Sequence, residues 1–187
     1  LHSFPTRRSS DLTQPMSMTQ IDQNFGAVEK NITYTDENGE EQTKAIKGEV
    51  TSSEVKQYWL KEDWFFDRQH STMDVRIIGM SPIRFYTKDD QSGMEPEIRR
   101  MWVFWIYFPE ARRILANHEV FNQFNDAERR TFDDIFFKRK FNSYIIKISN
   151  VYDDRGISEY SLGTQSMLEA ETLKKKIGDY EQDLWEY

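Results

Sequence analysis

The sequence predicts an α+β fold, with a small antiparallel sheet packed by several helices and long helices toward the C-terminus. Two segments rich in β-branched and aromatic residues, 74–86 and 101–108, are typical of sheet strands. Four other segments carry apolar residues at helical spacing, at 53–63, 110–118, 126–148 and 165–184. The length of 187 residues fits one ordinary domain, because a chain of this size hides about 70% of its unfolded surface.

The beginning of the chain has no regular period. Residues 1–12 look like translated sequencing adapter, so we expect a non-native or disordered leader over residues 1–20 and a missing native N-terminus. The polar stretch 13–25 is interpreted as a mobile lead-in. The remaining residues, 21–187, are predicted to form a single domain.

A β-hairpin is predicted early in that domain. Weakly alternating residues at 31–36 and 41–46 flank the pair Asn38-Gly39, and Asn-Gly supplies the positive φ angles of a tight turn. After it, Ser52 or Ser53 can cap the expected helix at 53–63.

The strand predicted at 74–86 is interrupted by Ser81-Pro82, after which extended structure resumes. The strand predicted at 101–108 is apolar without alternation, which favours burial of both faces. A small domain has difficulty covering both faces of such a strand, so we expect a partner protein to cover one of them.

The helices of the second half have recognisable starts. Pro109 suits the first turn of the helix at 110–118, and Asn125 with Glu128 resembles a capping box for a long helix at 126–148. The last helix, 165–184, carries an apolar seam at three- and four-residue spacing, formed by Ala170, Leu173, Ile177, Tyr180 and Leu184.

Composition excludes several classes of function. The net charge of −7 argues against general nucleic-acid binding, which needs a basic surface. The absence of cysteine excludes disulfides, cysteine-ligated zinc and thiol catalysis. The longest apolar run has eight residues, against about 20 for a membrane-spanning helix. Glycine-rich phosphate-binding motifs and a nucleophilic serine motif are absent from the sequence.

The remaining catalytic candidates have ordinary structural explanations. His118-Glu119 begins a zinc-protease pattern, but Asn122 stands where the second histidine ligand would be. A metal site that uses His70 and His118 is a minor alternative. Asp133-Asp134 would point about 100° apart on a helix, and Asp153-Asp154 has the composition of a turn. We therefore expect no enzyme activity, cofactor or metal.

Aromatic residues are the more informative set, because tryptophan and tyrosine are enriched at protein interfaces. The hypothesis is that the apolar strand and the C-terminus carry the protein interface. Its residues are Trp102, Phe104, Trp105, Tyr107, Trp185 and Tyr187.

From about residue 26 onward the chain resembles the GldN/PorN family of gliding-motility and type IX secretion proteins of Bacteroidetes. The resemblance is carried by six stretches in the family's order. They are Trp64-Phe65-Phe66-Asp67-Arg68-Gln69, Arg76-Ile77-Ile78-Gly79-Met80-Ser81-Pro82, Trp105-Ile106-Tyr107-Phe108-Pro109-Glu110-Ala111-Arg112, Asn125-Asp126-Ala127-Glu128-Arg129-Arg130-Thr131-Phe132-Asp133-Asp134-Ile135-Phe136, Ser149-Asn150-Val151-Tyr152-Asp153-Asp154-Arg155 and Asp183-Leu184-Trp185-Glu186-Tyr187.

The resemblance implies a structural protein of the periplasm, at the inner face of the outer membrane. Such proteins associate with one another and with a GldK/PorK-type lipoprotein in a ring complex, and connect with GldL–GldM-type motor proteins. The family has no catalytic residues to carry over, and we expect its secretory signal to be missing or replaced at the front of this sequence. The alternative is a periplasmic glycan-binding protein or hydrolase that uses tryptophan and paired carboxylates.

Overall fold

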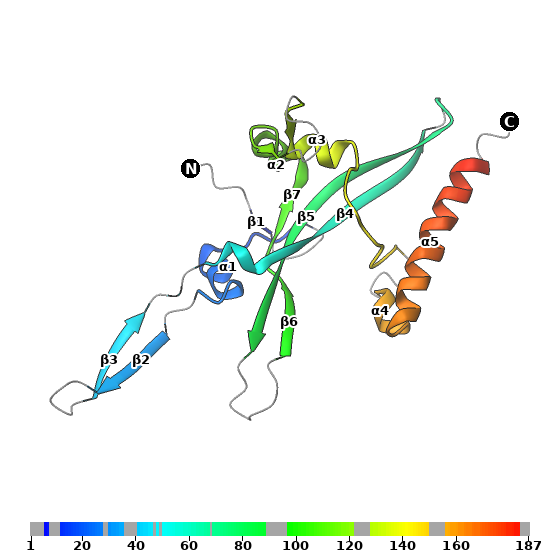
Figure 1. The fold of residues 1–187 in the computed structure, drawn as a ribbon. Coiled ribbons are helices and arrows are strands. Elements are labelled where there is room, and N and C mark those ends of the chain that lie inside the picture. The colour runs from blue at the N-terminus through cyan, green and yellow to red at the C-terminus, as the bar shows by residue number, and fades with distance from the viewer. Residues whose placement is uncertain are drawn as a thin grey trace. The chain divides into compact units, whose positions relative to one another are not determined.

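The computed structural model describes residues 6–7, 12–27, 30–35, 41–46, 48, 50–67, 69–88, 97–121, 128–149 and 156–183. It combines an antiparallel sheet with helices, including a long C-terminal one, so the α+β prediction is confirmed (Figure 1). The chain forms two compact units. Unit 1 contains Leu1–Asp63 and Arg76–Ile114, and unit 2 contains Trp64–Val75 and Leu115–Tyr187. The predicted leader at 1–20 and the single domain at 21–187 stay predictions.

The main sheet has five strands, of which the central one is β5. Its strands are β1 (Thr6–Arg7), β4 (Val55–Asp67), β5 (Thr72–Lys88), β6 (Glu97–Trp102) and β7 (Trp105–Tyr107). β5 lies between β4 and β7 and also pairs with β6, while β7 pairs antiparallel with β1. The tip of the β4–β5 hairpin, Trp64–Val75, belongs to unit 2.

β5 continues through Ser81-Pro82, where the sequence predicts an interruption. The partner of β5 changes there, from β7 at Gly79 and Met80 to β6 from Ile83 onward. Proline has no N–H to donate to a neighbouring strand, and Pro82 lies at this exchange of partners. The Pro82 carbonyl accepts a hydrogen bond from the Val103 N–H at 3.1 Å.

The prediction of one continuous strand over residues 101–108 is wrong. The chain leaves the extended ladder at Val103 and Phe104, between β6 and β7. The Val103 carbonyl, at a residue with no exposed surface, accepts a hydrogen bond of 2.7 Å from the Asn24 side chain. A side chain from a distant segment thus satisfies the polar group that the break would orphan.

The helix predicted at 53–63 is also wrong: Ser52–Glu54 form a single 3-10 turn, and the next residues form β4. Val55, Tyr58 and Trp59 have helical spacing, but three residues are too few to distinguish a helix from a strand. Aromatic side chains favour strands, and pairing with β5 supplies the hydrogen bonds that a helix would have made internally.

The predicted hairpin before it is confirmed. β2 (Lys30–Thr35) and β3 (Glu41–Ile46) form a separate two-stranded antiparallel sheet, in a register that pairs Thr35 with Glu41 (Figure 1). The turn pair Asn38-Gly39 lies outside the described residues.

Helix α1 (Met18–Asn24) occupies much of the stretch that was interpreted as a mobile lead-in, and that interpretation is wrong. Ser17 and Gln20 form a capping box, in which each side chain bonds the other residue's backbone N–H. Ile21 is buried, and Phe25 just after the helix packs against Phe104 with ring centroids 6.3 Å apart. The pattern S-x-x-Q from Ser17 to Gln20 was the sequence signal that could have predicted the start of α1.

The core of unit 1 forms where α1, the sheet and α2 (Phe108–Leu115) supply apolar side chains. Helix α2 confirms the helix predicted at 110–118, with bounds two to three residues earlier. The buried apolar residues of unit 1 are Ile21, Ala27, Met80, Ile83, Val103, Trp105, Phe108 and Ala111.

In unit 2 the long helix predicted at 126–148 is reduced to α3 (Phe132–Phe137). It follows a short antiparallel ladder of β8 (Glu119–Val120) with β9 (Arg130–Thr131). The predicted cap Asn125 lies outside the described residues, and Thr131 with Asp134 forms the capping box instead.

Helix α3 ends in a Schellman motif. Lys140 N–H donates to the Ile135 carbonyl at 2.9 Å, and Arg139 N–H to the Phe136 carbonyl at 3.2 Å. Arg139 has φ +50°, where glycine is the usual residue. Residues 142–149 then have no regular secondary structure.

The predicted C-terminal helix is confirmed as α5 (Thr164–Asp183), preceded by the short helix α4 (Ile157–Tyr160). The N–H of Ile157 donates to the Ile146 carbonyl at 2.9 Å and so joins α4 to the irregular segment. Along the predicted seam Ala170 is buried, Leu173 and Ile177 are half-buried and Tyr180 is exposed. Leu184 lies outside the described residues.

The capping box of α3 gives a pH-dependent prediction. Asp134 accepts hydrogen bonds from the Thr131 N–H at 3.0 Å and the Thr131 hydroxyl at 2.9 Å, and they hold its pKa below the usual value of 3.8. A carboxyl whose pKa falls on folding stabilises the fold above its unfolded pKa, and this contribution is lost as pH falls through the folded value. We therefore expect α3 to lose protection from amide exchange below about pH 4.

The measurement is amide hydrogen exchange of residues 131–138 between pH 2.5 and 6. Asp134→Asn should weaken protection at pH 6 and remove most of the acid-dependent loss, while Asp179→Asn on α5 is the matched control. The same acid dependence in the Asp134→Asn variant would contradict the assignment to this carboxyl.

Candidate protein-interaction surface

The four described residues of the predicted interface differ in exposure. Trp105 is 8% exposed and packs on Gly79, where an added Cβ would lie 3.3 Å from its ring. Trp102 and Phe104 are half-buried, and Tyr107 is 40% exposed. Within unit 1 the strand therefore contributes to the chain's own core, and Tyr107 has the most surface available to a partner.

The other two predicted residues, Trp185 and Tyr187, lie outside the described residues. The interface role of all six residues stays a prediction. Trp105 could meet a partner only after local rearrangement, because its side chain is already covered.

The described histidine and aspartate residues that were considered for catalysis make structural contacts. His70 Nδ1 lies 2.6 Å from Asp67 Oδ2 at the exposed tip of the β4–β5 hairpin. Hydrogen bonds from His70 and from the Gln69 N–H lower the pKa of Asp67. Asp134 caps α3. Within the described ranges no three histidine or acidic side chains gather to hold a metal ion. Asp153-Asp154 lies outside them.

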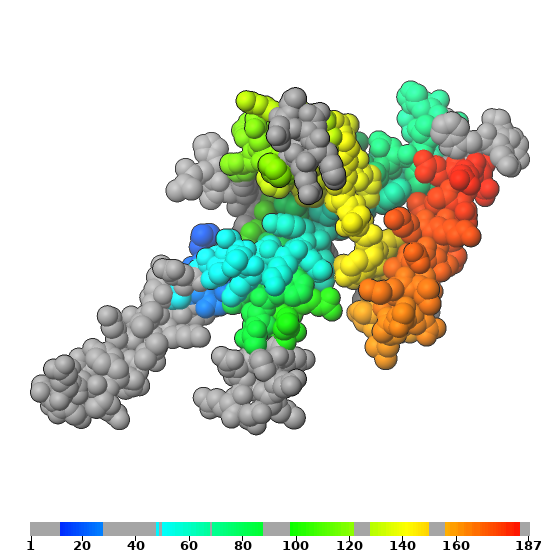
Figure 2. Space-filling view, viewed as in Figure 1, coloured from blue at the N-terminus to red at the C-terminus, as the bar shows by residue number. Residues whose placement is uncertain are grey.

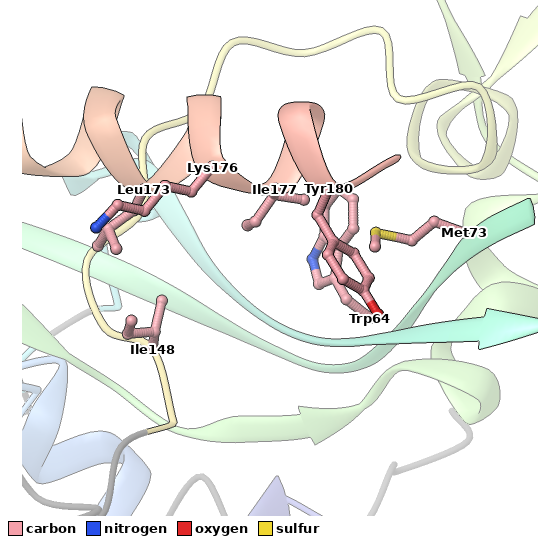
Figure 3. Close-up of a pocket in the computed structure, with 7 residues that line it drawn as sticks. All are labelled: Trp64, Met73, Ile148, Leu173, Lys176, Ile177 and Tyr180. Atoms are coloured by element: carbon pink, nitrogen blue, oxygen red, sulfur yellow. The ribbon is translucent and has the colours of Figure 1, made fainter. Parts of the chain in front are cut away.

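A concave surface lies in unit 2, along α5. It has a volume of about 380 Å³ and opens to solvent; we call it the α5 groove. Its lining residues are Trp64, Met73, Ile148, Leu173, Lys176, Ile177 and Tyr180 (Figure 3). Six of the seven side chains are apolar or aromatic, which is typical of a surface that binds another apolar group.

Three elements of unit 2 supply the walls. Trp64 and Met73 come from the tip of the hairpin, one from each strand, and Ile148 from the irregular segment. The α5 residues are spaced by three and four, so they share one face of the helix. In Figure 3 the side chains of Leu173, Ile177 and Tyr180 point toward the hairpin.

Trp64 is held by a contact with the end of α3. The guanidinium of Arg139 lies 5.3 Å from the Trp64 ring and 5.4 Å from the Phe141 ring. Phe141 in turn packs on Phe136, with centroids 5.8 Å apart. Arg139 thus ends α3 with a left-handed backbone and brings a cation near two aromatic rings, one of which lines the groove.

The groove keeps a large apolar surface in contact with solvent. Trp64 is 44% exposed and Tyr180 is 53% exposed. Its charged residue is Lys176, which follows Lys174 and Lys175 in the sequence, and all three are exposed. Figure 2 shows α5 at the surface in orange and red. Chemically the arrangement suits an apolar group that also carries negative charge.

Sequence reasoning identified the α5 wall of the groove through the three- and four-residue seam. It missed the opposite wall, because Trp64 was expected just beyond a helix and not on a strand. The available signal was the strand propensity of three consecutive aromatic residues, Trp64, Phe65 and Phe66.

Within the described residues no helix is long and apolar enough to cross a membrane. No curated protein is similar enough to the chain to count as a match. The sequence matches the family described as gliding motility associated protein GldN over residues 3–186, which is nearly its whole length. The chain therefore belongs to the GldN family of gliding-motility proteins.

Proposed function

We propose that this chain is a structural, protein-binding component of the type IX protein secretion and gliding motility apparatus. It acts in the periplasm, at the inner face of the outer membrane. There it assembles into a ring complex with a GldK/PorK-type outer-membrane lipoprotein and connects with GldL–GldM-type motor proteins. The proposal gives the chain a binding role and no catalytic role.

Membership in the GldN family over residues 3–186 is the observation that carries the proposal. The structure supports a binding role through the open apolar groove of unit 2 and the exposed face of Tyr107. A force-bearing assembly needs extended interfaces, since many contacts can share a load that one contact could not hold. Exposed aromatic residues supply large contact areas at low entropic cost.

The test is the mass of the full chain in solution, measured by light scattering, alone and after co-expression with the GldK-type lipoprotein of the same source. We expect an assembly of very high mass only when both proteins are present. Tyr107→Ser should weaken that assembly, whereas Tyr144→Ser, at another exposed tyrosine, should not.

A chain whose mass is unaffected by the lipoprotein would contradict the proposal. A saturable change of tryptophan fluorescence on addition of glycans, without any change of mass, would then favour the glycan-binding alternative.

A further inference from the structure

Strand β4 lies at an edge of the main sheet. The strand order runs β1, β7, β5, β4, so β5 pairs with one side of β4 and, among the described strands, none pairs with its other side. The described strands outside this sheet pair with each other, β2 with β3 and β8 with β9. Every second residue of β4 therefore points its backbone N–H and C=O groups away from β5. Such an edge is a template for a further strand.

The part of β4 that belongs to unit 1 is long and accessible. It covers residues 55–63, without a proline. Lys56, Gln57, Tyr58 and Asp63 are exposed and the other five residues are half-buried. Figure 2 shows this segment in cyan at the surface. Lysine on an edge strand normally opposes pairing with a further strand, unless a carboxylate of that strand faces it.

Backbone geometry limits the ways in which two copies of this edge can pair. In an antiparallel ladder the outward N–H and C=O groups come from alternate residues, so an outward residue of one strand faces an outward residue of the other. For two identical strands, this condition places the two-fold axis on a residue and never between two residues. Each possible register is therefore defined by the single residue at its centre.

Trp59 is the centre at which the charges match. It places Lys56 opposite Glu62 of the second copy, and Glu62 opposite Lys56 of the second copy. Between these charge pairs, Tyr58 faces Leu60 in both directions. The four pairs lie on one face of the sheet, because their residues alternate with those of the other face. Facing opposite charges stabilise antiparallel strands, and the tyrosine–leucine pairs bury apolar surface.

Neighbouring centres lack this match. When the axis moves by one residue in either direction, Lys56 faces the apolar side chain of Leu60 or of Trp64. An axis at Lys61 or at Glu62 places two like charges opposite each other, which destabilises the pair of strands. Glu62 also interacts within its own chain, and its two carboxylate oxygens have lone pairs for a second partner.

We propose that β4 pairs antiparallel with β4 of a second copy of this chain, with the two-fold axis at Trp59. The pairing joins the main sheets of the two copies. The charges of the segment are complementary to themselves, and this property selects a second copy as the partner. The contact goes beyond the proposed function, because it is isologous and closes in a dimer, whereas a ring needs head-to-tail contacts in addition.

Exchange of the two charges tests the pairing. The self-association constant of the full chain is measured by sedimentation equilibrium. Lys56→Glu and Glu62→Lys should each weaken self-association at least about tenfold, because each change creates two pairs of facing like charges. An equimolar mixture of the two variants should associate to within about threefold of the unchanged chain, since opposite charges face each other again. This recovery also excludes misfolding of the single variants.

The matched control is Lys175→Glu on α5, the same charge change at an exposed lysine. It should alter the self-association constant by less than about twofold, as for a surface charge outside the contact.

Cysteine pairs test the register independently of charge. The sequence contains no cysteine. Facing Cα atoms of antiparallel strands lie about 4.5–5.5 Å apart, which is within the range of a disulfide. A mixture of Tyr58→Cys and Leu60→Cys chains should therefore form a cross-linked dimer on mild oxidation. Either variant alone should form much less of it, because its own cysteines do not face each other.

Three results would overturn the proposal: a chain that stays monomeric, a mixture of the charge variants that stays apart, or no preference for the mixed cross-link. Loss of lipoprotein binding in the Lys56→Glu variant with unchanged self-association would also overturn it, and would assign this edge to the lipoprotein. A Lys56→Glu variant that loses self-association but still gains mass with the lipoprotein supports the dimer contact and leaves the proposed function standing.

Discussion

Replacement of Arg84 by alanine should lower the free energy of unfolding by about 3 kcal/mol, as for the loss of one partner from a largely buried ion pair. Arg84 Nε donates to Glu54 Oε2, and Nη1 donates to the Asn24 carbonyl at 3.1 Å. The guanidinium also lies 4.8 Å from the Tyr86 ring centroid. Its side chain is 14% exposed and that of Glu54 is 31% exposed, so solvent reduces the value from the upper end of the range.

These contacts join three parts of unit 1: the end of α1, the turn before β4, and β5 itself. Loss of Arg84 leaves the Glu54 carboxylate and the Asn24 carbonyl without that donor in a partly dry site. Urea denaturation followed by circular dichroism measures the effect. Arg84→Lys should retain part of the stability, because lysine keeps the charge but not the forked geometry.

Arg113→Ala on α2 is the control, because this arginine is exposed and its replacement removes the same charge. We expect a change of at most about 0.5 kcal/mol there, as at an ordinary surface position. Equal effects of Arg84→Ala and Arg113→Ala would show that the three contacts add nothing to stability.

Replacement of Gly26 by alanine should destabilise the chain by about 2–3 kcal/mol. Gly26 has φ +72°, where an L-residue costs roughly 1–2 kcal/mol. An added Cβ would also lie 2.6 Å from Arg84 Nη1 and 2.8 Å from Nη2. Both approaches are shorter than van der Waals contact, so the guanidinium would have to leave its position beside Glu54.

A double-mutant cycle separates the two causes. In the Arg84→Ala background the steric clash is gone, and Gly26→Ala should then cost only about 1–2 kcal/mol for its backbone conformation. Gly163→Ala is the control for the backbone alone, since Gly163 has φ +62° and nothing within 4 Å of an added Cβ. Strict additivity of the two changes would contradict a steric coupling between Gly26 and Arg84.

The elements that the sequence predicted correctly are those with a local cause. The last helix has a sustained apolar period over twenty residues, and it forms as α5. The hairpin of β2 and β3 follows from two short extended runs around an Asn-Gly pair. Helix α2 follows from a proline in its first turn. In each case the hydrogen bonds that define the element join residues at most 16 positions apart, so the local sequence suffices to specify it.

The wrong predictions concern segments whose hydrogen-bond partners are distant in sequence or whose ends are unusual. The residues of β4 have a helical spacing as well as strand propensity, and the pairing with β5 decides between them. Helix α3 stops at Phe137 because Arg139 adopts a left-handed conformation that sequence patterns assign to glycine. The aromatic contacts of Arg139 with Trp64 and Phe141 accompany that conformation.

The candidate binding surface was only half predictable. The α5 wall appears in the sequence as a seam at three- and four-residue spacing, whereas Trp64 and Met73 reach the groove through the pairing of two strands. The interface residues Trp102, Phe104, Trp105 and Tyr107 looked equivalent as neighbours in one apolar run. They differ in exposure because the strand breaks at Val103 and Phe104, where the Val103 carbonyl bonds the Asn24 side chain.

The sequence by itself determined the α+β class, the C-terminal helix, the early hairpin and the resemblance to the GldN family, since these depend on local spacing and on ordered stretches of residues. Only the tertiary structure decided which aromatic side chains are buried, where β5 exchanges partners, and that Arg84 connects α1 to the sheet. Those features depend on contacts between residues as far as 79 positions apart, such as Asn24 and Val103. The free energy of such contacts is gained only when the whole unit folds, so no local pattern reports it.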